Sequence, residues 1–243
     1  MLFVNKASVK VFDGQALVLW QLLLCVVALP IIMIVTGECH LGDRSPSLHA
    51  TLTTLWQWLP KSVLFLCVLQ TSTGSLITVN VETLTVFRTL TTLLVALVEL
   101  TWLRTNISRG ARMALVLTVI GAVIYAKEDI HFVFWGYVYV GLNVFSNSAY
   151  SLYSKVLVRR SVGGPFEQTF WNNTAAALVL LVIEMARCVH QGQVPSVSRI
   201  LRVNEFIALP WVNQMIVLAS AVVSLFLSWT VTLLTSMISA TVR

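Results

Sequence analysis

The residues Ala16–Thr36, with the sequence ALVLWQLLLCVVALPIIMIVT, decide the fold class of this protein. None of them is charged. A helix of roughly 20 mostly apolar residues can cross the hydrocarbon core of a bilayer, which is about 30 Å thick. Because lipid offers no partner for an unpaired backbone group, a spanning segment of this kind has to be helical. We therefore expect a transmembrane helix here, with a kink at Pro30.

The composition extends this interpretation to the whole chain of 243 residues, of which 57% are hydrophobic and 11% charged. Soluble domains average about 45–50% apolar and about 25% charged residues. These values exclude a secreted disulfide scaffold, a disordered tail and an ordinary cytosolic enzyme. The net charge of +6 comes from basic residues spread between apolar stretches, which is typical of membrane proteins, so we expect a lipid bilayer as partner and no nucleic acid.

Further apolar stretches follow along the chain, and together they predict an all-α polytopic integral membrane protein. Met1–Val9 resembles the last turns of a helix, and residues 241–243 resemble the beginning of another. We therefore expect residues 1–243 to form a single transmembrane domain that lacks both ends, with helical stubs there. The seven expected full spans are Ala16–Thr36, Trp58–Thr78, Val81–Leu103, Arg112–Ala126, Phe132–Tyr153, Phe166–Ala186 and Pro210–Leu234.

Lys and Arg residues in short loops predict the orientation, because cytosolic loops carry an excess of them. The connections Leu103–Arg112 and Lys155–Gly164 each hold three basic residues, whereas Lys127–His131 holds one. This alternation places the first two connections in the cytosol and the third in a lumen. The connection Arg187–Glu205 falls on the lumenal side although it holds three Arg residues.

Four polar residues of the fifth expected span share one helix face: Asn143, Asn147, Tyr150 and Ser154 follow at i, i+4, i+7 and i+11. Polar side chains in spans often mark a binding site or a pathway. The alternative is that they hold packed helices together through interhelical hydrogen bonds. We favour the lining of an aqueous cavity.

A second polar group lies on the sixth expected span, where Thr169, Asn172 and Asn173 fall within one turn. An amide offers both donors and an acceptor and is therefore suited to the edge of a nucleobase. Interhelical bonding is again the alternative. Two adjacent Asn side chains point about 100° apart, so packing alone does not obviously need both.

Arg88 stands inside the third expected span, about 16 Å along the helix axis from Glu99 and therefore too far to pair with it. A buried guanidinium can grip a phosphate through two hydrogen bonds. Pairing with another acid and snorkelling to a lipid headgroup are the alternatives. For the small polar run Gln70–Ser75 we expect helix packing instead.

The sequence offers nothing for catalysis or metal binding. The four His residues lie in expected loops without ligand spacing, and the four Cys residues show no C-x-x-C pattern. We find no Ser/His/Asp arrangement, phosphate-binding loop or H-E-x-x-H motif. We therefore expect no enzyme, no metal and no cofactor.

Several motifs in this order resemble the nucleotide-sugar transporter family of the drug/metabolite transporter superfamily. Phe170–Asn173, FWNN, is similar to the F-Y-N-N motif of GDP-mannose transporters, with Trp171 in place of Tyr. The other matching stretches are Val4–Lys6, Gln21, Ser75–Val81 followed by Thr85–Arg88, and Tyr150–Lys155.

The resemblance implies ten helices in two inverted five-helix repeats, with the ligand site between them. The seven spans would be helices two to eight, and the chain ends before the family's G-A-L-N-K motif. It also implies that Asn172 and Asn173 read the base and that Arg88 lines the cavity. The expected substrate-binding residues are Arg88, Asn143, Asn147, Tyr150, Asn172 and Asn173.

From this resemblance we expect a Golgi transporter that exchanges a nucleotide sugar, GDP-mannose first, for the nucleoside monophosphate by alternating access. Its partners would be these two ligands and the bilayer, and a homodimer stays open. The alternatives are a UDP-sugar or triose-phosphate-type exchanger on the same fold, or a degenerate membrane scaffold without transport. For the location, the endoplasmic reticulum membrane is the alternative.

Overall fold

The computed structural model describes residues 2–35, 48–101, 108–128, 133–160 and 165–241, and all regular structure within them is α-helical. The chain is therefore an all-α polytopic membrane protein, as the sequence predicts. The helices are α1 (Leu2–Val11), α2 (Gly14–Val35), α3 (Leu48–Thr78), α4 (Val81–Arg88), α5 (Leu90–Thr101), α6 (Arg109–Glu128), α7 (Phe134–Arg160), α8 (Pro165–His190), α9 (Val197–Ile200), α10 (Val203–Ala208) and α11 (Trp211–Thr241).

Each of the seven expected spans falls on a long helical segment, but the boundaries differ at three places. The third span is divided into α4 and α5, because the helix is interrupted at Thr89. The connection Arg187–Glu205, which we expected to be a lumenal loop, contains the end of α8, all of α9 and the beginning of α10. The seventh expected span ends at Leu234, whereas α11 continues to Thr241. Of residues 241–243, where we expected another helix to begin, Val242 and Arg243 lie outside the described residues.

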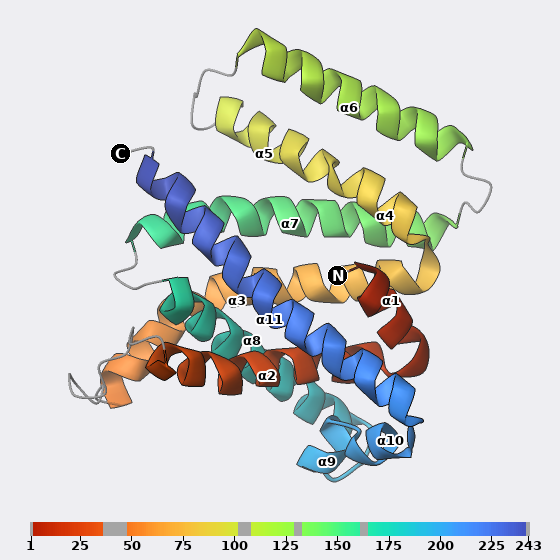
Figure 1. The fold of residues 1–243 in the computed structure, drawn as a ribbon, viewed down its shortest axis with the longest axis vertical. Helices are drawn as coiled ribbons and strands as arrows, with labels where there is room; N and C mark the ends of the chain where they lie inside the picture. Colours follow the sequence, from red (N-terminus) through yellow and green to blue (C-terminus); the bar gives the residue numbers. More distant parts are fainter. Residues whose placement is uncertain (1, 36–47, 102–107, 129–132, 161–164, 242–243) are drawn as a thin grey trace.

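Five of these segments are long and apolar enough to cross a membrane by length and composition within the described residues: α2, α4 with α5, α6, α8 and α11. The expected spans on α3 and α7 do not qualify, because both helices carry many polar side chains. This is tolerated because α3 and α7 lie side by side (Figure 1) and many of their polar side chains, among them Ser72, Asn143 and Ser148, are buried inside the molecule. Their polar faces meet other helices instead of lipid.

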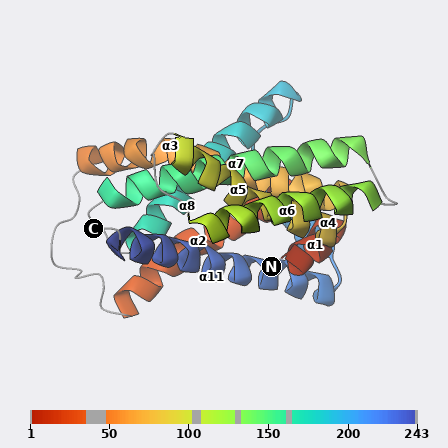
Figure 2. The ribbon, with the colours of Figure 1, turned by 90° about the horizontal axis from the view of Figure 1, so that it is seen from above.

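α3 and α7 lie along one side of the molecule, and α1 and α11 lie along the opposite side (Figure 2). α2 packs on α8, and α11 crosses α1, α2, α7 and α8. α4, α5 and α6 form one edge of the molecule, where α4 and α5 pack against α7 and α6 packs against α4 and α5.

The connection between α8 and α11 folds back onto the beginning of α2. Trp20 Nε1 donates to the backbone oxygen of Leu201 over 3.0 Å, and its ring stacks on Phe206 with 5.0 Å between the ring centroids. Arg202 lies 3.6 Å from a carboxylate oxygen of Asp13. These contacts close the bundle at the end where α1 and α2 meet.

Close helix contacts hold α3 and α7 together at one end of the pair. A Cβ atom added to Gly136 of α7 would lie only 2.6 Å from Val79 Cγ1, and one added to Gly74 of α3 would lie 3.0 Å from the ring of Tyr139. Small residues let membrane helices approach closely, which increases dispersion contacts between them. Because Gly136 has no side chain, α7 can approach the end of α3 closely at this point.

We expect Gly136→Ala to lower the free energy of unfolding by about 1–3 kcal/mol, because the added methyl group overpacks the contact with Val79. Gly141 of the same helix has no atom within 4 Å of an added Cβ. Gly141→Ala is therefore the matched control, and it should be neutral or raise stability by up to about 1 kcal/mol through helix propensity. Thermal unfolding in detergent measures both, and equal effects would contradict the close contact.

Candidate functional site

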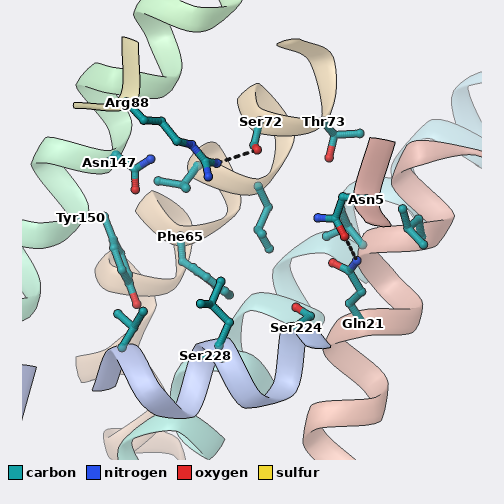
Figure 3. Close-up of a pocket in the computed structure, with 16 residues that line it drawn as sticks. Asn5, Gln21, Phe65, Ser72, Thr73, Arg88, Asn147, Tyr150, Ser224 and Ser228 are labelled. Carbon is teal, nitrogen blue, oxygen red and sulfur yellow. Dashed lines mark hydrogen bonds between the residues drawn. The ribbon is translucent and has the colours of Figure 1, made fainter. Parts of the chain in front are cut away.

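A cavity of about 160 Å³ lies between α1, α2, α3, α4, α7 and α11 (Figure 3). Its walls combine apolar side chains with amides and hydroxyls, and Arg88 is the one charged residue among those that line it. A cation in an otherwise neutral polar cavity favours an anionic ligand. The polar lining residues are Asn5, Gln21, Ser72, Thr73, Arg88, Asn147, Tyr150, Ser224 and Ser228.

Arg88 enters this cavity from the last position of α4. The helix stops there because the chain tightens, with the Thr89 amide donating to the Val86 oxygen over 3.2 Å. The guanidinium is held by neutral groups: Nη2 donates to Ser72 Oγ (2.8 Å) and Nε to Asn143 Oδ1 (3.4 Å). No carboxylate of the described residues pairs with it, so its charge is left for a ligand.

Glu99, the other charged residue of the third expected span, has a different partner. Its Oε1 lies 2.5 Å from Lys155 Nζ, which ties α5 to α7. The two side chains are partly exposed, so the pair itself adds little stability. Its consequence is that Glu99 does not neutralise Arg88.

Asn143, on α7, connects the guanidinium of Arg88 to α3. Its Nδ2 donates to Val68 O (3.0 Å) and Thr71 Oγ1 (3.1 Å), and its Oδ1 accepts from Arg88 and from Asn147 Nδ2 (3.4 Å). The side chain is fully buried and is not among the lining residues. Asn143 therefore forms hydrogen bonds between helices, whereas Asn147 lines the cavity.

Tyr150 lines the cavity one turn further along α7, and behind it lies a lysine that sequence analysis did not single out. Lys61 is only 1% exposed, and its Nζ lies 4.7 Å from the Trp58 ring centroid and 5.7 Å from that of Tyr150. Phe65 completes the aromatic group, with its ring 5.5 Å from Tyr150. A cation over aromatic faces is attracted by the ring quadrupole, and this holds Tyr150 in place.

Asn172 and Asn173 are buried in α8 and do not line the cavity. Asn173 Nδ2 donates to Thr169 O (2.8 Å) and to Ser228 Oγ (3.1 Å), and Ser228 does line it. Asn172 Oδ1 is buried and has no hydrogen-bond partner among the described residues. The structure therefore brings Arg88, Asn147 and Tyr150 to one cavity, places Asn143 and Asn173 one side chain behind it, and leaves Asn172 apart from it.

Six polar lining residues were not predicted as site residues: Asn5, Gln21, Ser72, Thr73, Ser224 and Ser228. Asn5 and Gln21 entered the sequence analysis only through the family resemblance, and Ser72 was assigned to packing. Ser224 and Ser228 follow a visible signal, since Ser220, Ser224 and Ser228 recur every fourth residue and so share one face of α11. From the sequence we considered the amides of the neighbouring spans and did not consider this row of hydroxyls.

Comparison with known proteins finds relatives that are named GDP-mannose transporter. The chain is 27% identical over 143 residues to a GDP-mannose transporter of Yarrowia lipolytica, covering 53% of this chain and 44% of that protein. It is 27% identical over 146 residues to one of Neurospora crassa, covering 53% and 37%. No family model matches the chain.

The similarities support a place in the nucleotide-sugar transporter family. The aligned part of the chain spans less than half of the length of these curated relatives. In inverted-repeat transporters the ligand binds between the repeats, near the bilayer midplane. The cavity of the present chain is lined by residues from α1–α4 and from α7 and α11, and these two groups of helices come from the two halves of the sequence.

We expect Asn143→Leu to lower the free energy of unfolding by about 1–3 kcal/mol, because Val68 O and the guanidinium of Arg88 lose buried partners. Leu142→Ala is the control, since Leu142 is its neighbour on the outer face of α7 and is 49% exposed. That change should stay within about 0.5 kcal/mol. Unfolding of both variants in detergent tests the role of Asn143, and a loss no larger than that of the control would argue against it.

Proposed function

We propose that the protein carries a nucleotide sugar across the Golgi membrane, with GDP-mannose as the first candidate, in exchange for the nucleoside monophosphate. The relatives named GDP-mannose transporter support this substrate class. The observation that carries the proposal is the unpaired guanidinium of Arg88 in an otherwise neutral cavity. No chemical change to the substrate is required, so the protein is not an enzyme in this proposal.

Arg88 would bind the phosphates. Its Nε and Nη2 are occupied by Asn143 and Ser72, and these bonds fix the plane of the guanidinium. A fixed guanidinium loses little conformational freedom when it binds phosphate oxygens. The neutral partners support the proposal, because a carboxylate in their place would compete with the ligand.

The amide pair on α8 would serve the base, as the family resemblance implies. In the structure Asn173 reaches the cavity through the hydroxyl of Ser228. The base would therefore meet either Ser228, oriented by Asn173, or Asn173 itself after Ser228 moves. Both routes place the base beside α8 and α11.

Transport would proceed by alternating access. The cavity of about 160 Å³ is smaller than the roughly 300–1,000 Å³ of typical ligand pockets. A nucleotide sugar would therefore have to separate the surrounding helices as it enters. The structure supports this as a compact state of a carrier.

A panel of ligands tests the function. The full-length protein is reconstituted into vesicles loaded with GMP, and uptake is followed for GDP-, UDP- and CMP-sugars, phosphoenolpyruvate and triose phosphates. We expect GDP-mannose uptake that depends on internal GMP. Uptake of a UDP-sugar or of triose phosphate instead would select the alternative exchanger, and no uptake of any member would overturn the transport proposal.

We expect Asn173→Ala in the full-length protein to abolish the thermal stabilisation that GDP-mannose and GMP confer. Ser228→Ala should give a similar loss if Asn173 acts through Ser228. Leu178→Ala, a change on the exposed side of the same helix where Leu178 is 47% exposed, is the control and should keep the ligand effect. Unchanged stabilisation in Asn173→Ala would remove this residue from the site.

A further inference from the structure

The end of the cavity opposite Arg88 is built by side chains from three helices (Figure 3). Asn5 comes from α1, Gln21 from α2, and Ser224 from α11. Behind them Ser220 Oγ donates to Asn5 Oδ1 over 2.6 Å, and Gln21 Nε2 donates to Ser220 Oγ over 2.7 Å. Gln21 Nε2 also lies 3.3 Å from Asn5 Oδ1, so each amide is held in a fixed orientation.

In this network each amide side chain forms hydrogen bonds through only one of its two polar groups, either the oxygen or the NH₂ group. Asn5 accepts through Oδ1, and Gln21 donates through Nε2. Within the part of the chain that the structure describes, no hydrogen bond is made by Asn5 Nδ2 or Gln21 Oε1. Since both residues line the cavity, this end offers it a donor group and an acceptor side by side.

The charge of this end differs from that of the Arg88 end. Lys6, next to Asn5 in the chain, donates to the backbone oxygen of Val79 over 2.7 Å and is not among the lining residues. A phosphate would therefore be drawn to Arg88. A sugar hydroxyl both donates and accepts a hydrogen bond, which matches the neutral donor and acceptor of the amides.

We propose that Asn5 and Gln21, with Ser224 beside them, form a subsite for the hydroxyl groups of the sugar. This rests on the proposed transport of a nucleotide sugar and fixes how the ligand lies: the phosphates at Arg88 between α3, α4 and α7, and the sugar at α1, α2 and α11. The subsite would then contribute to selection between a nucleotide sugar and the free nucleotide.

A purely structural network would hold α1, α2 and α11 together without contacting a ligand. Ser220 separates the two explanations, because it belongs to the network but is fully buried and does not line the cavity. Ser220→Ala weakens the network and leaves Asn5 Nδ2 and Gln21 Oε1 in place. It is therefore the matched control for a change in the lining residues.

The experiment measures the affinity of the full-length protein for GDP-mannose and for GDP, which lacks only the sugar, by ligand-dependent thermal stabilisation. We expect Gln21→Met to lower the affinity for GDP-mannose about tenfold and to change that for GDP less than twofold. Ser224→Ala, which leaves the hydrogen bonds among Asn5, Gln21 and Ser220 intact, is the second variant, with a selective loss of about threefold expected. Ser220→Ala should not discriminate between the two ligands.

Two results would overturn the subsite while leaving the transport proposal intact: equal losses for both ligands in Gln21→Met and Ser224→Ala, or a selective loss in Ser220→Ala as large as that in Gln21→Met. If the unchanged protein binds no member of the ligand panel, the transport proposal fails, and the subsite fails with it. Wild-type binding thus separates the two failures.

Discussion

The constraint on which the interior depends is the guanidinium of Arg88, a charge placed where the chain crosses a membrane. Such a group is costly unless polar partners surround it. Ser72 and Asn143 supply those partners from α3 and α7, and Asn143 in turn bonds the backbone of α3 at Val68. The polar character of α3 and α7 is thereby explained, since these two helices supply the polar groups that hold the charge.

The same arrangement makes the cavity unequal at its two ends. One end holds a fixed cation, and the other holds Asn5 and Gln21, which are neutral and fixed by Ser220. A ligand with a charged part and a hydroxyl-rich part would therefore be oriented on entry, because its charged part is drawn to Arg88 and its hydroxyls to the amides. The site is built from segments far apart in the sequence, which is why its function depends on the packing of α1 and α11 against α2.

The helical segments could be predicted from the sequence because long apolar stretches have a strong signal, as in Ala16–Thr36. The interruption at Thr89 could not, since Val81–Leu103 contains no Gly or Pro that would mark a break in the helix. Among site residues, helical spacing correctly joined Asn147 with Tyr150 on one face. Spacing along one helix could not tell that Asn143, on the same face, would lie behind Arg88, because that depends on the neighbouring helix.

Short sequence motifs indicated the family, whereas the packing of the helices showed where individual side chains lie. The motif around Asn173 indicated the family, but only the structure shows that Ser228 stands between Asn173 and the cavity. Lys61 illustrates the opposite case, a buried cation without a family motif. Trp58 lies one turn earlier in the same helix, but Tyr150 comes from α7, so no pattern within one segment could have predicted the second ring.

The outer position of α6 has a consequence for the surrounding lipid. Nearly all of this helix is exposed, and its apolar part between Arg112 and Lys127 rises only about 21 Å at about 1.5 Å per residue. This is shorter than a hydrocarbon core of about 30 Å. The bilayer therefore has to thin along this edge, or the two basic side chains have to extend toward the headgroups, and either response favours thin membranes over thick, sterol-rich ones.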